Sequence, residues 1–152
     1  MIELPLIELI FRVLMSILFG GIIGYDRERK GQSAGFRTHM LVCVGAAMFA
    51  LIQIKATNEV LTLAMNNSDY LQIFSIDQTR LVAQIVSGIG FLGAGAIIVT
   101  KRSVSGLTTA ASIWATAAIG ISMGMGYYLI AITGTVSIVT VLSWIKNKLI
   151  SV

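Results

Sequence analysis

The sequence predicts an all-α membrane protein with five transmembrane helices. Hydrophobic residues make up 56% of the chain and charged residues only 12%, and the mean hydropathy is +0.87. A soluble domain of 152 residues could not bury so much apolar surface. The charged residues also lie in short groups between long uncharged runs, which is typical of a polytopic membrane protein. The length allows a single domain.

The first two spans are predicted at residues 6–24 and 38–54. Pro5 suits the first turn of a helix, because its missing N–H needs no partner there. Glu8 and Arg12 are one helical turn apart and can pair on one face of the first span. Arg12 either snorkels to the near interface with Glu8 or is a functional charge that faces the interior of the bundle.

A long connection, residues 55–79, follows and has room for a short surface helix. The third span is predicted at residues 80–100, about 31 Å of helix, which matches the hydrocarbon thickness of a bilayer. Asp77 is placed to cap its first turn. Glycines in this span predict either close helix packing or a break in the helix. They are Gly88, Gly90, Gly93 and Gly95.

Three of these glycines also have the G-x-G-x-x-G spacing of a dinucleotide-binding fingerprint. That motif requires a preceding strand and an acidic residue about 20 positions further on. Here the preceding residues are predicted to be helical, and the position about 20 beyond Gly93 lies in apolar sequence near Trp114. We therefore interpret the glycines as packing residues and not as a nucleotide site.

The fourth and fifth spans are predicted at residues 107–124 and 128–145. Small residues recur at every fourth position of the fourth span and form a stripe along nearly its whole length. The stripe consists of Thr108, Ser112, Thr116, Gly120 and Gly124. It predicts close packing of a neighbouring helix without contact to a ligand. We also expect the chain to self-associate through such small-residue faces, with a dimer favoured.

The basic residues predict the orientation in the membrane. They gather in the first connection, the third connection and the tail, at Arg27, Arg29, Lys30, Arg37, Lys101, Arg102, Lys146 and Lys148. The opposite side carries Lys55 and Arg80, together with several carboxylates. By the positive-inside rule, the N-terminus lies outside and the C-terminus lies in the cytoplasm of a bacterial inner membrane.

This topology brings two groups of polar residues to the cytoplasmic face. They are Asp26, Arg27, Glu28, Arg37 and Thr38 from the first connection, and Thr108, Thr109 and Ser112 from the fourth span. Carboxylates and hydroxyls on one face could hold a hydrated Mg²⁺, although the neighbouring cations would repel it. The alternative is that Asp26 and Glu28 neutralise adjacent arginines. The sole histidine, His39, is expected to be a solvated interfacial imidazole.

A second group of polar residues lies toward the outer side, with Arg12. It consists of Asp77, Arg80 and Gln84. A helix cap and a salt bridge explain Asp77 and Arg80, whereas Gln84 lies about one turn into the third span and needs a partner there. The sequence shows no Ser/His/Asp set, no metal-type cluster of His or Cys and no phosphate loop, so an enzyme is not expected.

These residues resemble the MgtC/SapB family of bacterial inner-membrane proteins. The matching segments are GGIIGYDRE (20–28), AGFRTH (34–39), DQTR (77–80) with Ala83-Gln84, SGIGFLGAG (87–95) and GLTTAASIW (106–114). Their combination is specific, although each motif alone would not be. The family usually has Glu in place of Asp26 and Leu in place of Phe36.

The resemblance implies a role in adaptation to low magnesium or to acid stress, and in virulence. It implies regulation of other membrane complexes, such as the ATP synthase or a cation-transport ATPase, within the lipid bilayer and without nucleic acid. The alternative is a transporter or channel for Mg²⁺ or another small solute. Family members can carry a soluble cytoplasmic domain, whereas this sequence predicts the transmembrane domain alone, without a soluble C-terminal domain.

Overall fold

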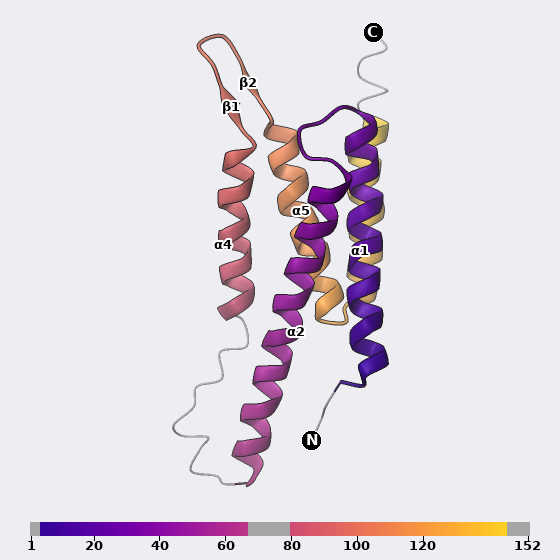
Figure 1. Ribbon diagram of the computed structural model, residues 1–152, viewed down its shortest axis with the longest axis vertical. Coiled ribbons are helices and arrows are strands. Elements are labelled where there is room, and N and C mark those ends of the chain that lie inside the picture. Colours follow the sequence, from indigo (N-terminus) through magenta and orange to yellow (C-terminus); the bar gives the residue numbers. More distant parts are fainter. Residues whose placement is uncertain (1–3, 67–79, 146–152) are drawn as a thin grey trace.

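The computed structural model describes residues 4–66 and 80–145 and confirms a helical membrane protein. Its helices are α1 (Leu6–Arg29), α2 (Phe36–Asn66), α4 (Arg80–Gly95), α5 (Leu107–Gly124) and α6 (Tyr128–Thr140), the last continued by the π-helical turn η1 (Val141–Ile145). Two short strands, β1 (Ile98–Val99) and β2 (Val104–Ser105), form an antiparallel hairpin. Figure 1 shows α4 on one flank of the bundle and α1 on the other.

Three of these helices are long and apolar enough to cross a membrane: α1, most of α2, and α5. Helix α4 and residues 128–143 form shorter apolar helices. Large hydrophobic side chains are widely exposed on the surface, for example Leu6 at 72% and Leu41 at 69%. Such a surface fits lipid as its solvent and would be a liability in water.

Helix α5 is the centre of the bundle, because it contacts α1, α2, α4 and α6. Its small-residue stripe packs directly on α2. A Cβ atom added at Gly120 would lie 2.2 Å from the carbonyl oxygen of Cys43, and one at Gly124 would lie 2.4 Å from that of Ala47. The prediction of close packing is therefore confirmed, and α5 is a helix with the bounds predicted for the fourth span.

The same contacts correct the expectation of self-association through this stripe. From Ser112 to Gly124, its members are buried inside a single chain. Only Thr108, at the end of the stripe, is exposed. The close approach that we expected between two chains occurs here within one chain, and self-association of the chain through another face stays a prediction.

The first two helices extend beyond the predicted spans. Helix α1 continues to Arg29 and α2 continues to Asn66, so the prediction of a connection over residues 55–79 is wrong as far as residue 66. Apolar residues such as Val60 and Ala64 keep a helical spacing, and a charged residue marks the edge of the hydrocarbon without ending a helix. The rest of the connection, with Asp77, lies outside the described residues.

The third span is shorter than predicted. Helix α4 ends at Gly95 and is followed by the β1–β2 hairpin, which the sequence analysis did not predict. The helix runs unbroken through Gly88, Gly90 and Gly93 and ends at Gly95, so the alternative of a helix break applies only to the last of the four glycines. Gly106 closes the base of the hairpin with φ +85°, and a Cβ atom there would lie 1.9 Å from the carbonyl oxygen of Ala96.

The loop between α1 and α2, the β1–β2 hairpin and the C-terminal end of α6 lie at the same end of the molecule (Figure 1). This arrangement brings Arg29 and Arg102 to one side, as the positive-inside argument requires. We call this the basic end. A cysteine placed at Ser33, which is exposed in the α1–α2 loop, should react with a membrane-impermeant maleimide only after the inner face is opened.

The native Cys43 gives a low background in this labelling experiment, because its side chain is 0% exposed. Reaction of the Ser33→Cys protein in intact cells would refute the predicted orientation. A cysteine at exposed Glu59, near the far end of α2, is the matched control and should show the opposite accessibility.

Candidate functional site

Polar side chains gather at both ends of the bundle. At the basic end, beneath the α1–α2 loop, they form the loop-side cluster of Arg27, Gln32, His39, Thr109 and Ser112. At the opposite end they form the Arg12 cluster of Glu8, Arg12 and Tyr128. Three of the residues predicted for the cytoplasmic face, Arg27, Thr109 and Ser112, are thus brought together.

Arg27 lies at the heart of the loop-side cluster and is 3% exposed. Its Nη2 atom donates to Gln32 Oε1 at 2.8 Å and to Thr109 Oγ1 at 3.5 Å. Its Nε atom is buried and has no hydrogen-bond partner in the described part of the chain. Arg27 therefore connects α1 to the first turn of α5, with one donor left over.

His39 is buried at 0% exposure, which corrects the expectation of a solvated imidazole. Its Nδ1 atom lies 2.8 Å from the carbonyl oxygen of Gly35, and its Nε2 atom lies 3.0 Å from Ser112 Oγ. A carbonyl can only accept, so Nδ1 carries the proton toward Gly35. The Ser112 hydroxyl also lies 2.8 Å from the carbonyl oxygen of Thr109, and its single hydrogen can serve only one of its two neighbours. The ring is a bridge between α2 and α5, which the position of His39 near Arg37 in the sequence did not reveal.

The two carboxylates of the first connection serve other contacts. Asp26 accepts from Lys30 Nζ at 2.8 Å and from Ser143 Oγ at 2.6 Å. Lys30 Nζ also donates to the carbonyl oxygen of Leu142 at 2.7 Å, which ties the end of α1 to η1. Glu28 Oε2 accepts from the backbone N–H of Phe36 at 2.7 Å and so caps the N-terminus of α2.

These contacts decide how well the basic end fits Mg²⁺. Asp26 is neutralised by Lys30, and Glu28 is held at a helix N-terminus. The part of the chain that the structure describes contains no group of three or more His, Cys, Asp or Glu residues able to hold a metal ion. Arg37, Thr38 and Thr108 are exposed outside the cluster. The residues at the basic end therefore do not fit a resident Mg²⁺ ion.

The Arg12 cluster ties three elements together at the other end. Arg12 is 8% exposed, donates to Glu8 Oε1 at 2.9–3.0 Å, and donates to the carbonyl oxygen of Gly124 at 2.8 Å. The hydroxyl of Tyr128 donates to the same oxygen of Glu8. Gly126, with φ +81°, leaves room for the guanidinium, because a Cβ atom there would lie 2.7 Å from Arg12 Nη2.

This arrangement answers the question about Arg12 that the sequence left open. The side chain faces the interior of the bundle, as the second alternative stated. It also pairs with Glu8, as the first alternative stated. A cation at Gly124 also sits at the negative end of the α5 dipole. The geometry is that of a structural tie between α1 and the α5–α6 turn.

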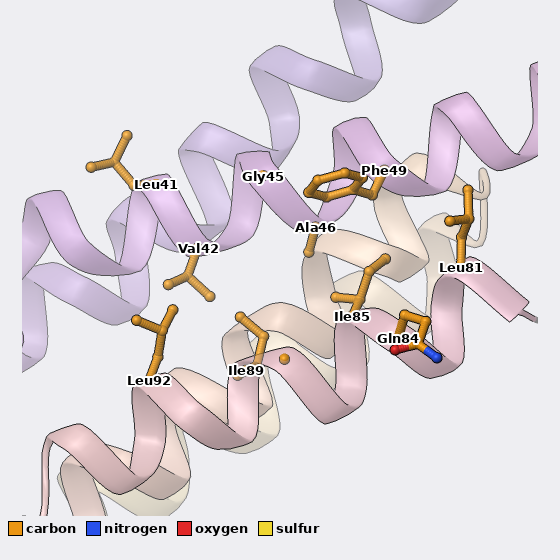
Figure 2. A pocket seen from close by; sticks show the side chains of 11 residues that line it. Leu41, Val42, Gly45, Ala46, Phe49, Leu81, Gln84, Ile85, Ile89 and Leu92 are labelled. Carbon is orange, nitrogen blue, oxygen red and sulfur yellow. The ribbon is translucent and has the colours of Figure 1, made fainter.

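The remaining predicted residues are on α4. Arg80 and Gln84 are both exposed. Gln84 lies in a groove of about 440 Å³ between α2 and α4, which is otherwise lined by apolar side chains and two glycines. Figure 2 shows Val42 and Leu92 facing each other across this groove.

The glycines that line the α2–α4 groove are not covered by other atoms of the described part of the chain. A Cβ atom added at Gly45 or Gly88, which both line the groove, would meet nothing within 4 Å, and the same is true of Gly90 and Gly95 elsewhere on α4. Of the four α4 glycines only Gly93 faces α5, since a Cβ atom added there would lie 3.6 Å from the carbonyl oxygen of Ala110. Small residues at an unoccupied helix face leave space for another helix.

Sequence reasoning missed Gln53. Its side chain is 8% exposed, and its Oε1 atom accepts from the backbone N–H of Leu81 at 3.1 Å, so it caps the first turn of α4. Asp77, which was predicted for that role, lies outside the described residues. A lone glutamine in an apolar run was the available signal, because such a residue needs a partner in the membrane.

Comparison with known proteins identifies relatives of the whole described bundle. The family model described as "MgtC family" matches residues 13–149. A protein of Escherichia coli strain K12 named "Putative magnesium transporter YhiD" is 41% identical over 135 residues, which cover 89% of this chain and 59% of that protein. The chain thus spans less than two thirds of that relative's length.

Two further relatives show the same range of similarity. "Protein SrpB" of Synechococcus elongatus is 40% identical over 145 residues, covering 90% of this chain and 74% of that protein. "Protein MgtC" of Brucella abortus is 41% identical over 126 residues, covering 83% of this chain and 46% of that protein. No solved structure matches the chain.

Proposed function

Because the chain belongs to the MgtC family of membrane proteins, we propose that it regulates other complexes of a bacterial inner membrane through contacts between helices. It does so without catalysing a reaction. The regulated process is adaptation to low magnesium or to acid stress, as the family resemblance implies. The observation that carries this proposal is a contrast between two surfaces. The small-residue stripe of α5 is covered by α2, whereas no described part of the chain covers Gly45 and Gly88 in the α2–α4 groove.

The polar groups within the bundle support this proposal because they are engaged in ties between elements. Arg12, Lys30 and His39 each bind a backbone carbonyl together with a side chain from another element. His39 and Ser112 do lie within hydrogen-bond reach, as a base and a nucleophile would, but they are 0% and 3% exposed and join α2 to α5 inside the bundle. These polar side chains therefore hold the helices of the described bundle together.

The open face supplies the surface for a partner. The α2–α4 groove contains Gly45 and Gly88, whose Cα atoms allow another backbone to approach, and Gln84, whose amide can form a hydrogen bond across helices. We propose that a transmembrane helix of the regulated complex packs here. A second copy of this chain in the same place is the other outcome that the experiment detects.

Gly88→Leu should abolish function without unfolding the protein, because its Cβ atom would meet nothing within 4 Å and the longer side chain would extend into the groove. The measurement is growth in low-magnesium medium of a strain that lacks its own member of the family and carries the variant. Gly90→Leu is the matched control: the space around it is equally open, and it lies about 200° around the helix from Gly88.

We expect wild type and Gly90→Leu to support growth, and Gly88→Leu to reduce growth to that of the empty strain at equal protein levels. Equal growth of both variants would contradict the groove as the working surface. Cross-linking of purified wild type and Gly88→Leu distinguishes a second copy from a different partner, since only self-association gives dimers of the pure protein.

A transporter is the second candidate, favoured by the name of the Escherichia coli relative and by Gln84 in the groove. Its test is uptake of Mg²⁺ by liposomes that contain the purified chain. Uptake that Gln84→Leu abolishes would favour transport. If wild type supports growth in low-magnesium medium but the liposomes take up no Mg²⁺ under any gradient, regulation is favoured, because the protein then acts without moving the ion.

A further inference from the structure

Arg27 is a buried cation without a carboxylate partner among the described residues. It is 3% exposed, and the ion pairs in that part of the chain join Arg12 to Glu8 and Lys30 to Asp26. Its Nε donor is buried and unbonded. Asp26 attracts Arg27 electrostatically but makes its direct ion pair with Lys30. A buried cation without a direct partner is unfavourable, so this side chain can accept an anion.

A second source of positive potential lies beside it. Helix α5 begins at Leu107 after Gly106, and no side chain caps this N-terminus. The first N–H groups of a helix have no partner within it and form the positive end of its dipole. Arg27 reaches this turn, since its Nη2 atom lies 3.5 Å from the hydroxyl of Thr109.

The two nearby carboxylates, Asp26 and Glu28, make their hydrogen bonds to other groups and not to Arg27. Asp26 binds Lys30 and Ser143, and Glu28 binds the N-terminus of α2. The group that meets the guanidinium is Gln32 Oε1, a neutral oxygen at 2.8 Å. Gln32 belongs to the α1–α2 loop and is only half-buried. Its amide oxygen occupies the position that one oxygen of an anion would take.

We propose that Arg27, Thr109 and the first backbone amides of α5 bind a phosphate-type oxyanion, and that Gln32 gives way to it. A guanidinium pairs with two oxygens of such a group, and a helix N-terminus offers N–H donors to the others. The anion is either inorganic phosphate or the phosphate of an anionic phospholipid in the leaflet at the basic end. This inference goes beyond the regulatory function and does not depend on it.

The experiment follows thermal unfolding of the purified full chain in detergent free of phosphate. One arm adds inorganic phosphate at constant ionic strength, with chloride as the control salt. The other adds phosphatidylglycerol, with phosphatidylcholine as the control lipid. A saturable rise in Tm in one arm identifies the source, whereas no rise in either arm overturns the proposal.

Two variants and a matched control test the site itself. Arg27→Gln should weaken the apparent affinity at least tenfold, while Arg29→Gln, an equal charge change at an exposed residue of the same helix, should change it less than twofold. Equal affinities in both variants would overturn the site.

Gln32→Glu keeps the proposal falsifiable if Arg27→Gln does not fold. The new carboxylate would lie where Gln32 Oε1 now accepts from Arg27. It should therefore raise Tm in the absence of added anions and abolish the response to them. A Gln32→Glu protein that still responds like wild type would show that the anion binds elsewhere.

Discussion

Gly120→Leu is expected to prevent the bundle from folding. The added Cβ atom would lie 2.2 Å from the carbonyl oxygen of Cys43, at a contact between two backbones that cannot both move. Overpacking of this kind costs about 3 kcal/mol or more, because neighbouring elements must separate. The measurement is the yield of monodisperse protein in detergent and its Tm, both of which should fall sharply.

Gly90→Leu is the matched comparison, since its Cβ atom would meet nothing within 4 Å. The same substitution should leave the yield and Tm close to those of wild type. If Gly120→Leu instead folds normally and only changes the oligomer mass, then the α5 stripe is an interface between chains and the packing described above is incorrect.

Arg12→Leu is expected to lower the free energy of unfolding by about 1.5–3 kcal/mol, the typical value of a hydrogen bond made by a charged group, here the buried bond from Arg12 to the carbonyl oxygen of Gly124. The loss leaves Glu8 without its cation and the carbonyl oxygen of Gly124 without its donor. It also frees the α5–α6 turn from α1. Chemical unfolding of the purified protein, followed by tryptophan fluorescence, measures the change.

The double variant Glu8→Leu with Arg12→Leu checks the cause. Removing both charges leaves no uncompensated carboxylate, so the double variant should be more stable than Arg12→Leu alone. A double variant that is less stable than Arg12→Leu would show that Glu8 stabilises the bundle without Arg12, through its bond from the hydroxyl of Tyr128.

The helices could be predicted from the sequence where local signals were sufficient. The span at residues 107–124 was predicted with its observed bounds, because glycines at Gly106 and Gly126 flank an apolar run. The ends of α1 and α2 were predicted too early. Hydropathy locates the edge of the hydrocarbon, whereas the last turns of these helices depend on polar contacts such as Lys30 with Asp26.

The candidate site was harder to predict, because its contacts join distant parts of the chain. Arg27, Thr109 and Ser112 were placed at the same end by the positive-inside rule alone. That His39 lies between α2 and α5, and that Gln53 caps α4, follows from how the helices pack. Periodicity within one helix contains no information about these partners.

The most direct test of the account uses a photo-cross-linking residue in place of Gly88, in native membranes. If a partner helix fills the α2–α4 groove, a discrete protein adduct forms at Gly88 and none forms at Leu14, which is 59% exposed on α1. Absence of an adduct at Gly88, or the same adduct at both positions, would contradict the claim that the α2–α4 groove receives a partner helix.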